Sequence, residues 1–548
     1  MLEGVTPWPE DFVLDYRQKG YWQETSISEM FDQIADAFPN REALVSGNLR
    51  LTYQELRKKA DCLAASFISI GLRPLDRLIL QLPNAPEFVY IYLALAKIGV
   101  IPVMCLAAHR QSEIEYIAQH TGAKGYVIPE NTLKFDYLAL AHEVQRKVPG
   151  VKYIFTIGLE DGDGCLSINK LLEKDTVFSQ EQTALYKPNP FNAAVFQLSG
   201  GTTGMPKIIP RLHTDYVYNS RMCGLIAGFN HYTVFLATTP LAHNFALACP
   251  GIQAVLMVGG KIVIPTAHQP KDVFAAIQQE RVTYVPAVPA MLINWINSPE
   301  ISNYDLSSWQ VVISGGAKLN PEVASRVKPV LGCKLQQIFG MAEGLLVMTS
   351  LDDPEEAVLE TIGKPISPGD EVKIVDDEGN EVEPGQVGEM ICRGPYTLRG
   401  YYKASEHNEK AFTGDGFFRT GDLVRKRLDG FLTVEGRKKD LINRGGEKIS
   451  VEEIENLILA HPAVANVAVV AMPDQILGER ACAYVSLKAG NSLELEQLNN
   501  YLLEQKIAKF KLPERLEVLD VFPLTNVGKI SKKDLRNDIH RKLSEEEK

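Results

Sequence analysis

Helix-like and strand-like hydrophobic patterns alternate along the first part of the chain. Apolar residues recur at helical spacing from Tyr53 to Ile70 and from Glu87 to Ala96, and short apolar runs follow from Arg77 to Leu82 and from Gly99 to Met104. Helices and short strands that alternate in this way are typical of βαβ units. The pattern therefore predicts an α/β fold for this region.

A different pattern begins near Asp370, where short β-prone runs lie between Gly, Pro and Asp turns as far as Thr433. It predicts a small β-rich subdomain. The chain then becomes basic and polar, which is typical of an exposed linker. We expect a large N-terminal domain (1–436) with two βαβ-type subdomains and the β-rich subdomain, a hinge (437–440), and a small, mobile α+β C-terminal domain (441–548).

Composition and charge narrow the class of protein. The 548 residues carry a net charge of −11 and contain no run of five basic residues, which argues against a nucleic-acid or anionic-membrane partner. The most apolar stretch, 245–265, is interrupted by proline, glycine and lysine, which argues against a membrane-spanning helix. The first residues lack a signal-peptide pattern, and the eight cysteines form no C-x-x-C pair. We therefore expect a cytoplasmic protein with reduced thiols.

A glycine-rich segment follows the strand-like run from Ala193 to Leu198. It reads Ser-Gly-Gly-Thr-Thr-Gly-Met-Pro-Lys over residues 199–207, and its backbone N–H groups, hydroxyls and lysine suit a polyphosphate. It is not a Walker A loop, because Pro206 precedes the lysine and Ile208 follows it. Taken alone, the segment is equally consistent with an ordinary surface loop.

Four further motifs decide between these two interpretations of the segment. They are Phe-Gly-Met-Ala-Glu at 339–343, Phe-Arg-Thr-Gly-Asp at 418–422, Gly-Arg-Lys-Lys-Asp at 436–440 with Gly-Gly-Glu-Lys at 445–448, and Pro-Leu-Thr-Asn-Val-Gly-Lys at 523–529. With these five motifs the chain resembles, over nearly its whole length, the acyl-adenylate-forming superfamily of acyl- and aryl-CoA synthetases, luciferases and peptide-synthetase adenylation domains. The resemblance implies ATP-dependent, Mg²⁺-assisted activation of a carboxylic acid as acyl-AMP, followed by transfer to a thiol.

The resemblance also implies roles for individual residues. Glu343 would hold Mg²⁺ as a hard oxygen ligand, Asp422 would accept hydrogen bonds from the ribose hydroxyls, and Lys529 would contact both the attacking carboxylate and the α-phosphate. The implied catalytic residues are Lys529, Lys207, Glu343 and His243. The implied ATP- and AMP-binding residues are Ser199, Gly200, Gly201, Thr202, Thr203, Gly204, Gly315, Gly316, Ala317, Ile338, Phe339, Gly340, Met341, Ala342, Asp422, Arg437 and Lys448. Lys439 would be the pivot of a domain rotation between the two half-reactions.

The segment from His243 to Gly251 bears on the choice of acid. It resembles the acid-pocket segment of stand-alone aryl acid adenylating enzymes of siderophore biosynthesis, which activate salicylate or 2,3-dihydroxybenzoate. Asn244 stands where amino-acid-activating relatives carry an aspartate for the substrate ammonium, and its amide could donate to a carboxylate and accept from an ortho hydroxyl. Cys249 resembles the residue of salicylate enzymes, so salicylate is the expected substrate. The implied substrate-binding residues are Asn244, Phe245, Cys249, Gly316, Leu346 and Lys529.

Several alternatives stay open at this point. The substrate could be 2,3-dihydroxybenzoate or 3-hydroxypicolinate, since Cys249 could be merely a small buried residue. Departures from the subfamily at 107–108 and 287–290 put the finer shape of the pocket in doubt. No carrier domain follows in the sequence, so we expect a separate aryl carrier protein with a phosphopantetheine thiol as acceptor, or CoA if the chain is an aryl-CoA ligase. A catalytically silent homologue is disfavoured by the intact motifs.

Overall fold

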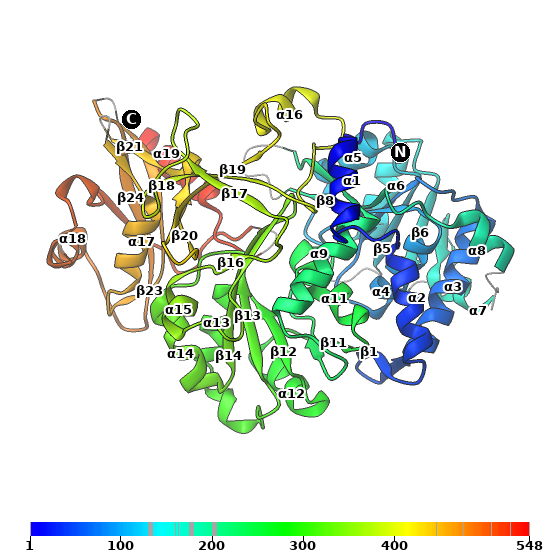
Figure 1. Ribbon diagram of the computed structural model, residues 1–548. Helices are drawn as coiled ribbons and strands as arrows, with labels where there is room; N and C mark the ends of the chain where they lie inside the picture. The colour runs from blue at the N-terminus through cyan, green and yellow to red at the C-terminus, as the bar shows by residue number, and fades with distance from the viewer. Residues whose placement is uncertain are drawn as a thin grey trace.

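The structure is a computed structural model that describes residues 2–129, 135–158, 161–162, 164–174, 180–199, 205–444, 447–474, 476–505, 507–525 and 528–546. Two large sheets with covering helices, a four-stranded antiparallel sheet and a C-terminal α+β unit make up the molecule (Figure 1). This architecture confirms the predicted fold class.

The first large sheet has seven strands, and its neighbouring strands are parallel except for the last pair. In spatial order they are β7 (Cys165–Ser167), β6 (Tyr153–Ile157), β5 (Gly125–Pro129), β3 (Arg77–Gln81), β4 (Ile101–Cys105), β8 (Ala193–Leu198) and β9 (Ile208–Leu212). The helices of this region are α3 (Tyr53–Ile70), α4 (Pro86–Lys97), α5 (Gln111–Thr121), α6 (Tyr137–Lys147), α7 (Ile168–Glu173) and α8 (Gln180–Tyr186). The glycine-rich segment connects the antiparallel strands β8 and β9.

The second large sheet has nine strands and a parallel centre with antiparallel edges. In spatial order they are β16 (Lys364–Pro365), β15 (Gly344–Met348), β14 (Lys334–Met341), β13 (Val311–Gly315), β12 (Tyr284–Ala287), β10 (Val234–Leu236), β11 (Lys261–Ile264), β1 (Glu42–Ser46) and β2 (Leu49–Thr52). Its region includes α9 (His213–Ile226), α10 (Asn244–Ala248), α11 (Gly251–Met257), α12 (Pro270–Glu280), α13 (Pro289–Ile296), α14 (Pro321–Leu331) and α15 (Glu355–Glu360).

Helix α3 shows how local sequence sets an element's ends. The Thr52 side chain accepts from the Glu55 backbone N–H, and the Glu55 carboxylate accepts from the Thr52 N–H at 2.8 Å, which forms a capping box. The helix ends at Gly71, whose φ of 115° lies in the region that favours glycine. Tyr53 to Ile70 is also the range that the sequence predicted.

Helix α4 lies in the core. Every residue from Phe88 to Lys97 is buried, and the Lys97 ammonium forms ion pairs with Asp32 at 2.6 Å and Asp61 at 2.9 Å. A buried charge requires such partners.

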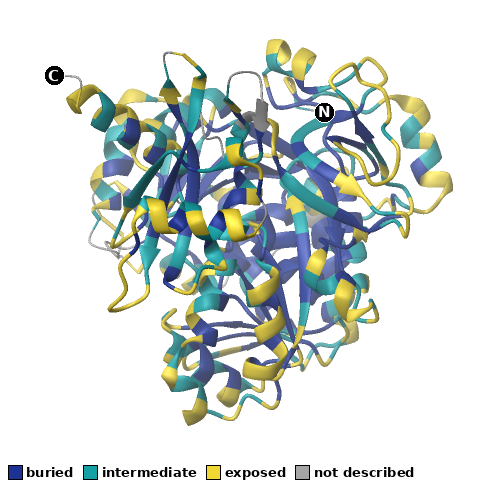
Figure 2. Cartoon of the chain, turned by 90° about the vertical axis from the view of Figure 1, so that its left-hand side faces the viewer, coloured by how far each residue is buried: buried dark blue, intermediate teal, exposed yellow. Residues whose placement is uncertain are grey.

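Figure 2 shows that exposed positions lie mainly on the outer helices and loops.

The most apolar stretch of the sequence folds into α10, α11 and β11, and its side chains are mostly buried. Among the helices that the structure describes, none is long and apolar enough to cross a bilayer.

The smaller units follow along the chain. The antiparallel sheet consists of β17 (Glu371–Val375), β18 (Val387–Arg393), β19 (Phe418–Lys426) and β20 (Leu432–Arg437), with α16 (Ser405–Ala411) between β18 and β19. The C-terminal unit contains β21 (Ile442–Arg444), β22 (Glu447–Ile449), α17 (Val451–Leu459), β23 (Val464–Asp474), β24 (Gly478–Leu487), α18 (Leu495–Glu504), β25 (Arg515–Val518) and α19 (Lys532–Glu546). N-terminal helices α1 (Glu10–Gln18) and α2 (Ile27–Ala37) complete the molecule.

Candidate active site

The glycine-rich segment connects β8 to β9. The Ser199 N–H donates to the Lys207 carbonyl at 2.9 Å, and the Lys207 N–H donates to Ser199 Oγ at 3.0 Å, so these two residues close the base of the loop. Gly200, Gly201, Thr202, Thr203 and Gly204 lie outside the described residues.

Glu343 lies in the turn between β14 and β15, in a small group that the sequence did not predict. The Tyr401 hydroxyl donates to Glu343 Oε1 at 2.9 Å, and the Lys207 ammonium lies 5.2 Å from the centre of the Tyr401 ring. Burial, and secondly the Glu343 charge, raises the pKa of Tyr401, so its hydroxyl stays a donor. Tyr401 thus connects the lysine of the glycine-rich segment to the proposed metal ligand.

Asp422 and Arg437 face each other across β19 and β20. They occupy paired positions in the sheet, and Arg437 Nε lies 2.8 Å from Asp422 Oδ1. Asp422 is buried, and its Oδ2 has no hydrogen-bond partner among the described residues. Burial raises the pKa of Asp422, while Arg437 opposes this shift. A buried acceptor without a donor is costly, and a ribose hydroxyl would satisfy it.

The proposed adenine-binding residues lie at the ends of two parallel strands. Gly315 ends β13 and pairs with Ile338 of β14. A Cβ at Gly315 would lie 2.6 Å from Ile338 Cγ2 and 3.2 Å from Phe245 Cζ, so only glycine permits this close packing. Gly316 and Ala317 follow β13, and the remaining predicted residues of this group, Phe339, Gly340, Met341 and Ala342, continue along and just beyond β14.

Lys529 brings the C-terminal unit to this site. A Cβ at Gly316 would lie 3.5 Å from Lys529 Cε. Loss of hydration, and secondly the Arg437 charge, lowers the pKa of Lys529 to about 8, whereas Asp422 raises it. The Lys529 residue as a whole is still exposed to solvent. The structure therefore places the lysine of the last motif beside Gly316, in electrostatic contact with Asp422 and Arg437.

His243 caps the helix that begins the acid-pocket segment. Its Nδ1 accepts from the Phe245 N–H at 3.2 Å, at the N-terminus of α10. Burial, and secondly the Lys529 charge, lowers the pKa of His243 to about 4, so the imidazole is neutral at pH 7. Phe245, which follows it, is buried against Gly315, and Leu346 of β15 is buried as well.

Asn244 is already held by two side chains. The Tyr216 hydroxyl donates to Asn244 Oδ1 at 2.5 Å, and Asn244 Nδ2 donates to Cys249 Sγ at 3.1 Å. Asn219 Nδ2 lies 3.5 Å from the same sulfur. The Asn244 oxygen, which we expected to accept from a substrate hydroxyl, therefore already accepts one hydrogen bond from Tyr216, and one of its two lone pairs remains.

Arg211 is a buried residue that sequence reasoning missed. Its Nε lies 3.0 Å from Asp215 Oδ1, its Nη1 donates to the Ala342 carbonyl at 3.0 Å, and its guanidinium lies 4.6 Å from the Tyr216 ring centre. Arg211 therefore connects Asp215 and Tyr216 of α9 to Ala342, the residue before Glu343. Its only sequence signal is the unusually polar run 211–220, of which every residue is buried.

The predicted hinge follows β20 directly. Lys439 lies in a short 3-10 turn (Lys438–Asp440), and Lys448 lies in β22, where it pairs with Asn443. The side chains of both lysines are outside the described part of the structure. The roles proposed for them therefore stay predictions.

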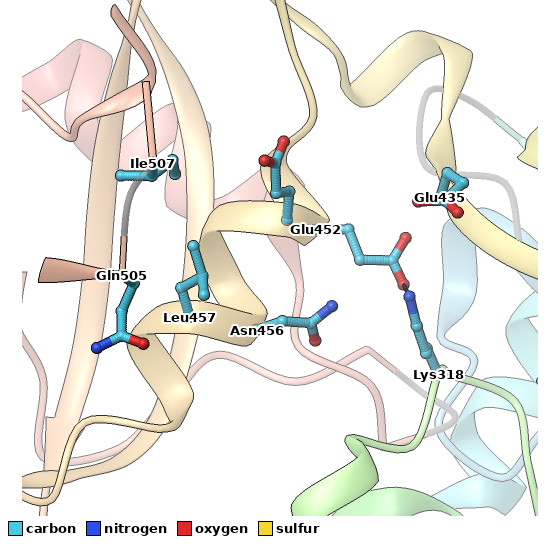
Figure 3. Close-up of a pocket in the computed structure, with 8 residues that line it drawn as sticks. Lys318, Glu435, Glu452, Asn456, Leu457, Gln505 and Ile507 are labelled. Atoms are coloured by element: carbon cyan, nitrogen blue, oxygen red, sulfur yellow. Dashed lines mark ion pairs between the residues drawn. The ribbon is translucent and has the colours of Figure 1, made fainter. Parts of the chain in front are cut away.

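A cavity of about 370 Å³ lies between the end of β20 and α17, and none of its lining residues belongs to the five motifs (Figure 3). Lys318 extends into it and forms an ion pair with Glu452 at 3.7 Å. Ser450 Oγ donates to the Glu435 carbonyl at 2.8 Å nearby. The full lining is Lys318, Glu435, Glu452, Glu453, Asn456, Leu457, Gln505 and Ile507. The Lys318–Glu452 and Ser450–Glu435 contacts beside this cavity join the C-terminal unit to the rest of the chain.

Family models match both parts of the chain. The model of the AMP-binding enzyme family matches residues 31–402, and the model of the AMP-binding enzyme C-terminal domain matches residues 453–529.

Individual relatives match over nearly the full length. The chain is 44% identical over 543 residues to the 2,3-dihydroxybenzoate-AMP ligase of Bacillus subtilis (strain 168), with 99% of each chain covered. It is 45% identical over 543 residues to a salicylyl-CoA synthase / salicylate adenylyltransferase of a Streptomyces species, with 98% of each covered. The apo structure of MbtA from Mycobacterium smegmatis is similar with a TM-score of 0.75 and 38% identity, covering 97% of this chain and 98% of that one.

Proposed function

The chain belongs to the AMP-binding enzyme family, and on this premise we propose that it activates an aryl carboxylic acid, preferably salicylate, as an aryl-AMP. One observation carries the proposal. Lys529 of the C-terminal unit lies beside Gly316 and within electrostatic reach of Asp422 and Arg437 of the large part. The ammonium, the proposed ribose acceptor and the strand end at Gly315 and Gly316 are therefore near one another, which supports a role in adenylation.

The first half-reaction joins two anions. A carboxylate oxygen of the acid attacks the α-phosphorus of ATP, the bond to the β-phosphate oxygen breaks, and pyrophosphate leaves. Negative charge develops around the α-phosphorus, and a fixed ammonium there lowers the barrier. Lys529 supplies this charge. Asp422 would bind the ribose through its unpartnered Oδ2, with Arg437 holding the other carboxylate oxygen.

Mg²⁺ fits this site through Glu343. Its carboxylate is a hard oxygen ligand that would hold the ion, and substrate phosphates and water would supply the remaining ligands. The ion would neutralise charge on the ATP phosphates when bound. Tyr401 donates to one oxygen of Glu343 and so orients the carboxylate.

The acid pocket suits an uncharged aromatic ring. His243 is neutral at pH 7, Asn244 and Cys249 carry no formal charge in their usual states, and Phe245 and Leu346 are apolar. No carboxylate in this set could pair with a substrate ammonium. The names of the two relatives, one for 2,3-dihydroxybenzoate and one for salicylate, support an ortho-hydroxylated benzoate.

The second half-reaction transfers the aryl group to a thiol. The thiol sulfur attacks the aryl carbonyl carbon, and AMP leaves. An aryl carrier protein is the proposed acceptor, and CoA is the alternative, which the name of the Streptomyces relative favours. Rotation of the C-terminal domain about residues 437–440, with Lys439 as the pivot, would replace Lys529 by the β22 region near Lys448.

Pyrophosphate exchange tests the first half-reaction. Salicylate, 2,3-dihydroxybenzoate and 3-hydroxypicolinate are compared with benzoate, an aliphatic acid and an amino acid. We expect the highest kcat/KM with salicylate and no exchange with the last two. If none of the aryl acids supports pyrophosphate exchange, the proposal is refuted. Thioester formation with CoA and with a holo carrier protein, assayed side by side, then identifies the acceptor.

A further inference from the structure

A hydrogen-bonded chain behind the acid pocket fixes the direction of the Asn244 amide. Gln197 Nε2 lies 3.1 Å from the Tyr216 hydroxyl oxygen and donates to it, and the hydroxyl in turn lies 2.5 Å from Asn244 Oδ1. All three side chains are buried. Because the tyrosine oxygen already accepts from Gln197, its proton is directed to Asn244.

Tyr216 itself has little freedom to move. Its ring is covered by the Arg211 guanidinium at 4.6 Å, and its backbone carbonyl accepts from Gln253 Nε2 at 2.9 Å. Burial raises the pKa of Tyr216, so the hydroxyl keeps its proton. With Tyr216 as a fixed donor, the Asn244 oxygen must face it, and the two N–H donors of the amide must face the other way.

One of these two donors is used within the protein. Asn244 Nδ2 donates to Cys249 Sγ at 3.1 Å, which leaves the second N–H for a substrate. A reversed amide would present its oxygen instead, at the cost of an unpaired tyrosine donor.

The direction of this amide selects between ortho substituents. In salicylate the phenolic proton is bonded internally to the carboxylate, so the phenolic oxygen presents a lone pair outward and accepts a hydrogen bond. In 2-aminobenzoate one N–H is bonded internally, so the second N–H points outward and donates. A pocket that offers N–H therefore pairs with the first acid and opposes the second.

We propose that Tyr216 is a positioning residue that fixes the Asn244 amide as a donor and so selects ortho-hydroxy over ortho-amino aryl acids. The inference rests on the proposed aryl acid activation. Tyr216 contacts no substrate and acts through Asn244.

The test compares Tyr216→Phe with the parent enzyme. The substitution removes only the hydroxyl and keeps the ring under Arg211. The matched control is Tyr218→Phe, on the same helix, whose buried hydroxyl lies 2.7 Å from Ser367 Oγ. Pyrophosphate exchange gives kcat/KM for salicylate, 2-aminobenzoate and unsubstituted benzoate, together with KM for ATP.

We expect the ratio of kcat/KM for salicylate to that for 2-aminobenzoate to fall about tenfold or more in Tyr216→Phe. The ratio should change less than about twofold in Tyr218→Phe, and benzoate activity and KM for ATP should stay near the parent values in both. In an Asn244→Ala background, Tyr216→Phe should leave the ratio unchanged, which a merely structural tyrosine would not predict.

An active Tyr216→Phe enzyme with an unaltered ratio would overturn the inference, and so would an equal loss for all three acids. If that variant does not fold, Gln197→Leu tests the same step, because the freed tyrosine oxygen could then accept from a reversed amide. The ratio should fall in the same direction, and an unchanged ratio there also refutes the inference. If no aryl acid supports pyrophosphate exchange in the parent enzyme, the proposed function itself is refuted.

Discussion

Replacement of Lys529 by alanine should disable adenylation and spare the second half-reaction. The Lys529 side chain lies beside Gly316, where the charges of Arg437 and Asp422 act on its ammonium, and its positive charge would be available there to the α-phosphate. The substitution removes that charge. It alters no strand of the large sheets, since Lys529 lies on a loop before α19 whose turn is held by Thr525. Folding and ATP binding should therefore survive.

The magnitude follows from the setting of the charge. Lys529 is exposed to solvent in this structure, so an effective dielectric near 20 applies, and two unit charges about 4 Å apart then interact by about 4 kcal/mol. Part of this attraction already exists in the ground state, because ATP is anionic before it reacts. Only the increment in the transition state counts, and about 3 kcal/mol corresponds to a loss of roughly 10²–10³ in rate.

The assay is salicylate-dependent pyrophosphate exchange, with Lys533→Ala as the matched control on an exposed lysine of α19. The control should retain parent activity. Lys529→Ala should still form thioester from synthetic salicyl-AMP at a rate near that of the parent. Exchange within a few-fold of the parent, or an equal loss in both half-reactions, would refute the role assigned to this lysine.

Four further outcomes are expected. The pKa of Lys529 is lowered to about 8 and its protonated form is the active one, so kcat/KM should fall as the pH rises through about 8. In Lys529→Arg this fall in kcat/KM should occur at a higher pH. Asp422→Asn should raise KM for ATP by about tenfold or more, because it replaces the carboxylate that both pairs with Arg437 and would accept from the ribose. An unchanged KM for ATP would show that Asp422 does not bind the ribose. Cys249→Ser should raise kcat/KM for 2,3-dihydroxybenzoate relative to that for salicylate by about tenfold. The Asn244 and Asn219 amides would donate to the serine oxygen and leave the serine proton for the 3-hydroxyl of the substrate. A parent enzyme that already prefers 2,3-dihydroxybenzoate would contradict the assignment. Lys439→Pro should slow thioester formation far more than pyrophosphate exchange, whereas equal losses would refute the hinge.

Much of the fold could be predicted because its signals are local. Tyr53–Ile70 and Ala193–Leu198 have the predicted ends, since helical periodicity with caps and a short apolar run before glycine both act within a few residues. Strand β23 extends to Asp474, beyond its mostly apolar run from Val464 to Ala471. It continues as a hairpin with β24, whose backbone pairing does not need apolar side chains.

Part of the candidate site could likewise be predicted from local sequence, and part of it could not. Asp422, Glu343 and Lys529 belong to contiguous motifs and could be recognised without a structure. Tyr401 could not be assigned, because it meets Glu343 across 58 positions of sequence and its own segment looks like an ordinary turn. Tyr216 was missed for a similar reason, since a tyrosine in a helix is most simply read as core packing.

The polar contacts beside the α17 cavity, between the C-terminal unit and the rest of the chain, are weak. The Lys318–Glu452 pair has a separation of 3.7 Å with both side chains partly exposed, and such pairs contribute at most about 1 kcal/mol. The adjoining hydrogen bond from Ser450 to the Glu435 carbonyl adds about 1 kcal/mol, and a cavity of about 370 Å³ takes the place of close packing. The rotation proposed about residues 437–440 would therefore lose no more than about 2 kcal/mol from these two contacts.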